Sequence, residues 1–180
     1  MPLKLNTASS GSVTLIPADT ASNYTITVPA QTATVITNKT AGTVLQVVNA
    51  TYGTQVSSSN NTFVDTGLTA SITPTSATSK ILVLVSQNGC RKSSASADNM
   101  IDLRLMRDST QLSAFYGALG STDTAIANTV SASVCYLDSP ATTSSVTYKT
   151  QFASRNNTAS VQVQFAGVSV STITLLEIAA

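Results

Sequence analysis

Apolar and polar residues alternate along much of the chain, as they do in β-strands that bury one face. This alternation is clearest over 101–105, 130–136, 146–152 and 161–165. The segments between these stretches are rich in Ser, Asn and Gly, which favour turns. Together they predict about eight or nine strands across residues 43–180. We find no apolar face of helical period, so no substantial helix is expected.

Two stretches carry apolar residues on both faces of the predicted strand. Residues 80–85 read Lys-Ile-Leu-Val-Leu-Val, and residues 171–178 read Ser-Thr-Ile-Thr-Leu-Leu-Glu-Ile. The outer faces of a two-layer sandwich are exposed to water. Strands that are apolar on both faces therefore need a cover on the side away from the core. We expect sister subunits to supply that cover, with coverage by the N-terminal segment as the alternative.

Residues 1–42 form a distinct N-terminal β segment. Its apolar positions fall in short strands, and Tyr24, Ile26 and Val28 alternate with threonines. Three short strands with thin apolar faces cannot build a core of their own. We therefore interpret 1–42 as an anchor or trimerisation segment that packs on something else. Its candidate contact residues are Val13, Leu15, Tyr24, Ile26 and Val28.

Glycines and prolines place the predicted turns. Asp65–Gly67 and Pro74–Ser79 are expected to be turns, and Gly117–Gly120 a loop. Gly89 follows the buried run, which predicts that the strand ends there and that Arg91 and Lys92 sit at a loop tip. That basic tip is a candidate contact to a partner.

The composition agrees with an all-β protein and excludes some partners. Charged residues make up 9% of the chain and the net charge is +1, so the polar surface must consist mainly of Thr, Ser, Asn and Gln. Because no field of one sign can form, a nucleic-acid surface is not expected. The fold class we predict is an all-β, jelly-roll-type β-sandwich over 43–180, preceded by the short β segment.

Candidate chemistry is sparse. The sequence contains no His, which removes the commonest general base and metal ligand, so we expect no catalytic residue, no metal site and no cofactor. Cys90 and Cys135 are interpreted as reduced thiols, although they could pair. The start of the chain lacks the apolar core of a secretory signal, and no apolar run is long enough to span a bilayer. We expect synthesis in a host cytoplasm and no membrane contact.

Two stretches resemble known structural proteins of viruses. Gly11-Ser-Val-Thr-Leu15 followed by Ala21-Ser-Asn-Tyr-Thr-Ile-Thr-Val-Pro29 resembles a short module of tailed-phage structural proteins, notably those infecting cyanobacteria and other aquatic bacteria. Residues 44–48 and 63–83 resemble the start of phage fibre-tip domains, which are similar to trimeric jelly rolls of the tumour-necrosis-factor and complement-head type. The resemblance implies a homotrimer at the virion surface, with strand 174–178 near the threefold axis. The candidate interface residues are Leu175, Ile178, Tyr136 and Phe152.

Three functions are compatible with these features. The first is a capsid decoration, or cement, protein that docks on other virion proteins such as the major capsid protein. The second is a short tail fibre or receptor-binding protein that contacts a host surface glycan. The third is a glycan-degrading enzyme, which would require a longer chain and paired acids in a groove. We favour decoration, because only about 40 residues precede the sandwich and a fibre usually carries a longer shaft.

Overall fold

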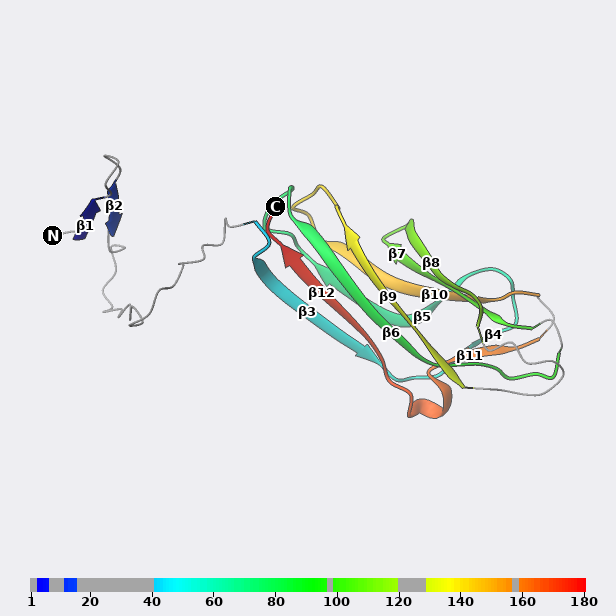
Figure 1. Ribbon diagram of the computed structural model, residues 1–180. Coiled ribbons are helices and arrows are strands. Elements are labelled where there is room, and N and C mark those ends of the chain that lie inside the picture. The colour runs from blue at the N-terminus through cyan, green and yellow to red at the C-terminus, as the bar shows by residue number, and fades with distance from the viewer. Residues whose placement is uncertain (1–2, 7–11, 16–40, 97–98, 120–128, 157–158) are drawn as a thin grey trace. The chain divides into compact units, whose positions relative to one another are not determined.

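The computed structural model describes residues 3–6, 12–15, 41–96, 99–119, 129–156 and 159–180 (Figure 1). The chain divides into two compact units, Met1–Val35 and Ile36–Ala180, and each is described by itself. The boundary predicted at residue 42 lies a little further along the chain.

The first unit contains an antiparallel pair of strands, β1 (Leu3–Asn6) and β2 (Ser12–Leu15). Of the predicted anchor residues, Val13 pairs with Leu5 and Leu15 pairs with Leu3. Tyr24, Ile26 and Val28 lie outside the described residues.

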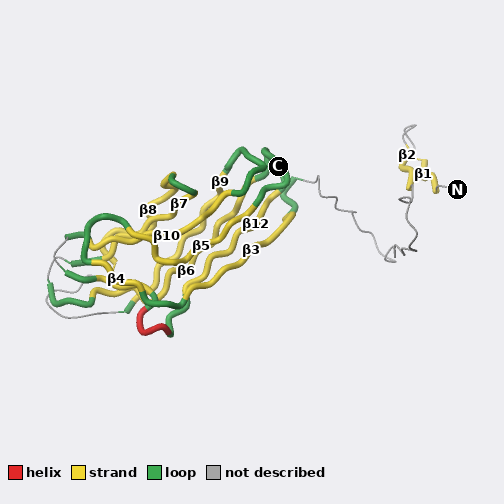
Figure 2. The backbone as a smooth tube through the Cα atoms, turned by 180° about the vertical axis from the view of Figure 1, so that it is seen from behind, coloured by secondary structure: helices red, strands yellow, loops and turns green. Residues whose placement is uncertain are grey.

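The second unit is an all-β sandwich of two antiparallel sheets, with one short 3₁₀ turn, η1 (Phe165–Gly167), drawn red in Figure 2. The first sheet has the order β3-β12-β6, and β9 pairs with the free side of β6. At one end β11 and β4 extend this sheet beside β6. The second sheet has the order β5-β10-β7-β8. The strands are β3 (Val44–Tyr52), β4 (Val56–Ser58), β5 (Val64–Ile72), β6 (Lys80–Lys92), β7 (Ile101–Arg107), β8 (Thr110–Leu119), β9 (Val130–Asp138), β10 (Val146–Ser154), β11 (Val161–Val163) and β12 (Ser171–Ile178).

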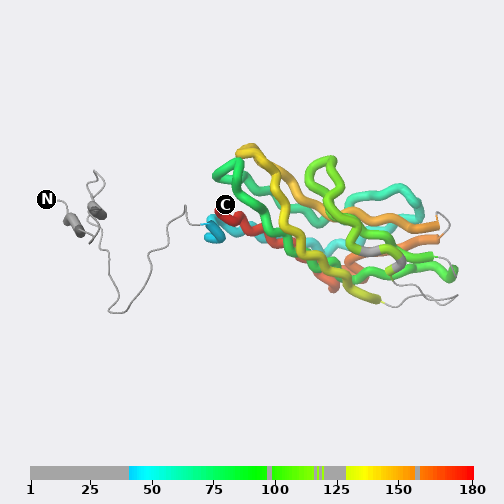
Figure 3. Tube along the Cα trace, turned by 45° about the horizontal axis from the view of Figure 1, so that its top comes forward, coloured from blue at the N-terminus to red at the C-terminus, as the bar shows by residue number. Residues whose placement is uncertain are grey.

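The sandwich begins and ends at the same end of its first sheet. Figure 3 shows the C-terminus beside the start of the cyan segment. There the Gly42 amide donates a hydrogen bond to the Ala179 carbonyl at 2.8 Å, and the Ala179 amide donates to the Thr43 carbonyl at 2.9 Å. These bonds tie the entry of the chain to the last strand.

Two of the predicted turns are β-bulges within strands. Gly67 lies inside β5 with a φ of +88°, and the pairing of β5 with β10 shifts register beside it. Gly89 lies inside β6 with a φ of +64°, where the pairing with β9 shifts register. A bulge uses glycine at positive φ for the same reason that a turn does. Two predictions were therefore wrong: Asp65–Gly67 is not a turn, and β6 does not end at Gly89. Gly117–Leu119, expected to be a loop, is also part of a strand, β8.

The core consists of two apolar clusters separated by a polar layer. The larger cluster contains Ile81, Val83, Tyr148, Ile173 and Leu175 among others, and the smaller contains Cys90, Leu103, Phe152 and Val161 among others.

Between the clusters, buried polar side chains hydrogen-bond to one another across the two sheets. Thr150 Oγ1 lies 2.6 Å from Thr66 Oγ1 and donates to Gln87 Oε1 at 2.8 Å. Gln87 Nε2 donates in turn to Ser171 Oγ at 3.0 Å. Because these groups are buried, their mutual bonds offset the loss of water and fix the register of the sheets.

Candidate functional site

The outer faces of the two sheets differ in chemistry. On the outer face of β5-β10-β7-β8, which we call the charged face, Lys149 Nζ lies 2.9 Å from Asp65 Oδ2. Nearby, Arg155 Nη2 lies 2.8 Å from Asp102 Oδ1. Hydrogen bonds from Gln151 and Lys149 hold the pKa of Asp65 below its usual value, although burial acts in the opposite direction. Charged pairs of this kind stay hydrated at little free-energy cost, so this face suits contact with water.

The outer face of the first sheet carries a row of aliphatic residues that runs directly across four strands. Leu176 of β12 pairs with Val47 of β3 on one side and with Leu82 of β6 on the other. Leu82 pairs in turn with Leu137 of β9. Because paired residues point to the same side of a sheet, these four side chains form one continuous apolar strip. We call this surface, over residues 80–86 of β6 and their partners, the leucine face.

The rows on either side of this strip grade from apolar to hydroxyl-bearing. Towards the C-terminus Ile178 pairs with Val44 and Lys80. In the opposite direction Leu84 lies between Thr174 and Cys135, and the row beyond it contains Thr172, Ser86 and Ser133. Among the described residues of this surface, Lys80 at its end is the sole charged side chain.

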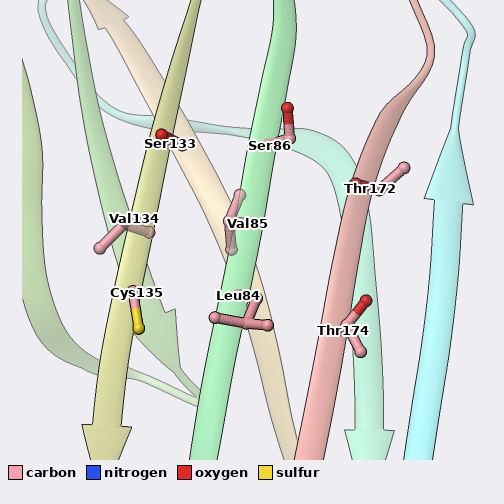
Figure 4. Close-up of a pocket in the computed structure, with 8 residues that line it drawn as sticks. All are labelled: Leu84, Val85, Ser86, Ser133, Val134, Cys135, Thr172 and Thr174. Carbon is pink, nitrogen blue, oxygen red and sulfur yellow. The ribbon is translucent and has the colours of Figure 1, made fainter.

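The apolar side chains of the leucine face remain open to solvent in the single chain. Val47 is 59% exposed, Leu137 52%, Val44 46% and Leu84 39%. A contiguous patch of this kind is uncommon on soluble monomers and marks a contact surface. Figure 4 shows its hydroxyl-bearing end, with Leu84, Cys135, Ser133, Thr172 and Thr174 among the labelled residues. These residues line a shallow hollow of about 300 Å³.

The predicted interface residues fall in different environments. Leu175 and Phe152 are wholly buried within one chain, where they belong to the two core clusters. Tyr136 is half-buried and packs against the larger cluster. Ile178 alone lies on the leucine face, beside Val44. The alternation pattern missed the outward residues, namely Val47, Leu82, Leu84, Leu137 and Leu176. The signal that could have found them was the apolar character of both strand faces.

Arg91 and Lys92 lie within β6 and not at a loop tip, because the bulge at Gly89 lets the strand continue. The Arg91 guanidinium stacks on the Phe165 ring, 3.8 Å from its centroid. Lys92 is wholly buried, and its Nζ donates a hydrogen bond to the Ser96 carbonyl at 2.6 Å. The predicted placement of this pair in an exposed loop is therefore corrected, and Lys92 cannot serve as a surface contact.

The two cysteines are free thiols in unlike surroundings. Cys90 is buried in the smaller core cluster, and desolvation raises its pKa to about 12. Cys135 is exposed on the leucine face. Because thiolates and not thiols react with alkylating reagents, Cys135 is the thiol that reagents can reach and Cys90 is inert.

The described residues offer little else that resembles a chemical centre. They contain no group of three or more metal-ligating side chains, and none of their helices is long and apolar enough to cross a membrane. A scan against models of protein families gave no match for this chain. A search of curated proteins likewise found none that is similar.

Proposed function

We propose that this protein is a non-enzymatic structural component of a tailed-phage virion surface that works as a homotrimer. The observation that carries the proposal is the contrast between the two outer faces of the sandwich. The leucine face needs a cover, whereas the charged face is suited to water. A second copy of the chain can cover the leucine face with apolar residues of its own. Closed cyclic symmetry then limits the number of copies in the assembly.

The strand order supports a jelly roll of the trimeric head type. The leucine face is built on the order β3-β12-β6-β9, and the opposite sheet has the order β5-β10-β7-β8. Except for β7 and β8, which form a consecutive hairpin, strands adjacent in each sheet come from opposite halves of the chain, as expected when a long hairpin folds over on itself. The resemblance of residues 44–83 to trimeric fibre-tip domains points in the same direction.

Within the virion, capsid decoration is the function we favour. The protein would dock on other virion proteins through its N-terminal segment, and copies would add buried area across capsid seams. A short tail fibre or receptor-binding protein is the second candidate. One observation favours it: the charged face contains a groove lined by polar and aromatic side chains.

Two measurements test this proposal. Size-exclusion chromatography with light scattering should give three times the chain mass of 18.5 kDa, and a stable monomer would contradict the trimer. Quantitative gel densitometry of purified phage particles should find the protein at a copy number close to that of the major capsid protein if it decorates the head. A copy number close to that of tail proteins would favour the fibre, and absence from the particles would refute the virion assignment.

A further inference from the structure

The charged face contains a groove of about 310 Å³ that is separate from the leucine face. It is lined by side chains from β7, β8 and the segments next to β5 and β10. They include Phe63, Asp102, Gln111, Ala114, Gly117 and Arg155. The alternation pattern does not predict a site at any of these residues, because each has the character of an ordinary surface position.

The polar groups of the groove are held in place before any ligand arrives. Arg155 donates to both carboxylate oxygens of Asp102, from Nη2 at 2.8 Å and from Nε at 3.3 Å. A Cβ on Gly117 would lie 2.8 Å from Arg155 Nη2, so glycine is what allows the guanidinium to reach across β8. A bidentate salt bridge of this kind fixes the planes of the guanidinium and the carboxylate.

The aromatic wall is fixed in the same way. The Arg104 guanidinium lies over the Phe63 ring, 4.1 Å from its centroid. It also donates from Nε to Gln151 Oε1 at 2.9 Å and from Nη1 to Gln111 Oε1 at 3.2 Å. The Gln111 amide, with its oxygen committed to Arg104, presents its NH₂ group as a donor. The result is a half-buried ring beside planar donors and acceptors of fixed orientation.

This lining selects for a neutral ligand with many hydroxyl groups. The charges of Asp102 and Arg155 offset each other, and the third charged group, Arg104, is engaged with the Phe63 ring and with the amide oxygens of Gln151 and Gln111. An anion would therefore meet the Asp102 carboxylate and a cation would meet the guanidinium groups. A sugar hydroxyl both donates and accepts, and it can bridge a carboxylate oxygen and a guanidinium or amide N–H at once. The apolar C–H face of a pyranose ring matches the Phe63 ring and the Ala114 methyl group.

We propose that this groove binds a neutral hexopyranose unit of a cell-surface glycan. The inference rests on the proposed function only in that the charged face stays exposed in the assembled trimer. All the groups of the groove come from one chain. A sugar-binding monomer would therefore refute the trimer and leave the groove standing, whereas a trimer that binds no sugar would refute the groove alone.

Saturation-transfer NMR on the full chain tests the proposal. The probes are the methyl glycosides of glucose, galactose, mannose and N-acetylglucosamine, with glucuronic acid as the anionic comparator and inorganic phosphate, which has no carbon-bound protons to observe, added as an anionic competitor. Phe63→Ala removes the ring, and Gly117→Ala displaces the Arg155 guanidinium while it leaves every polar group of the groove in the chain. Phe165→Ala is the matched control, because Phe165 is also a half-buried ring under an arginine but lies outside the groove. Thermal unfolding verifies that each variant is folded.

We expect at least one neutral glycoside to receive saturation, and we expect each groove variant to weaken its binding about tenfold, since one oriented polar or ring contact is lost. Phe165→Ala should bind as the wild type does. The proposal is overturned if no neutral glycoside binds, if the anionic probes bind more tightly, or if both groove variants retain wild-type affinity.

Discussion

Leu137→Glu is the substitution that most sharply separates an intersubunit role from a role in the single chain. Leu137 ends the aliphatic strip that crosses β3, β12, β6 and β9, and 52% of its surface is exposed in one chain. A glutamate there remains hydrated in the monomer, so the sandwich itself should keep its stability. If a sister subunit covers the strip, the same glutamate is buried without a partner.

The size of the effect follows from burial. Covering the exposed half of a leucine contributes about 1 kcal/mol, and this contribution is lost in the variant. An unpaired carboxylate taken out of water adds a penalty of several kcal/mol. Even a total of about 3 kcal/mol at one contact weakens association more than a hundredfold. A cyclic trimer contains three such contacts, so the variant should be monomeric at micromolar concentration.

Light scattering after size-exclusion chromatography measures this directly. We expect the mass of Leu137→Glu to fall to that of the single chain, 18.5 kDa, with a thermal unfolding curve that still shows a folded sandwich. Val168→Glu is the matched control, because Val168 is 81% exposed and lies outside the leucine face. A Leu137→Glu variant that keeps the oligomeric mass of the wild type would refute the role of this face.

Three further predictions concern the stability of the sandwich. Burial would raise the pKa of Glu177, but hydrogen bonds to its carboxylate outweigh this effect and lower the pKa. The ionised carboxylate therefore stabilises the fold above about pH 4.5, and this stabilisation is lost as the pH falls through the folded-state pKa. The difference in unfolding free energy between wild type and Glu177→Gln should narrow on acidification. Tyr148→Phe removes the 2.7 Å bond from the buried hydroxyl to Asp138 and should lower the unfolding free energy by about 1–3 kcal/mol in urea titrations. Gly67→Ala drives a Cβ into the Tyr52 ring at a φ of +88°, so we expect a lower melting temperature. An unchanged melting temperature would show that the bulge tolerates a side chain.

Much of the fold could be predicted from the alternation of residues, because each strand of a sandwich buries one face. The last strand was predicted at its observed bounds, Ser171–Ile178, and Pro74–Ser79 does separate two strands. The errors at Gly67 and Gly89 share one cause. Gly67 and Gly89 were interpreted as ends of strands, but positive φ serves bulges and turns alike, and only the partner strand decides between them.

The site could be predicted only in part. Because β6 and β12 are apolar on both faces, the sequence predicted that their outer side needs a cover. A continuous apolar run does not show, however, which of its alternating residues point to the core. Leu175 was assigned to the interface because the family resemblance implies that strand 174–178 lies near the threefold axis, whereas the structure places Leu175 in the core of one chain and its neighbour Leu176 outside. The groove on the charged face could not be predicted, since it depends on contacts between residues far apart in the sequence, such as Arg155 with Asp102.

The most direct test of the central claim is the rate at which Cys135 reacts with a maleimide as the protein is diluted. Cys135 lies on the leucine face beside Leu84, and the buried Cys90 reports unfolding if it too becomes labelled. We predict slow labelling of Cys135 at concentrations where the trimer persists, and fast labelling after dilution or in Leu82→Glu, with Cys90 unlabelled throughout. Fast labelling of Cys135 at every concentration would contradict the claim that a sister subunit covers this face.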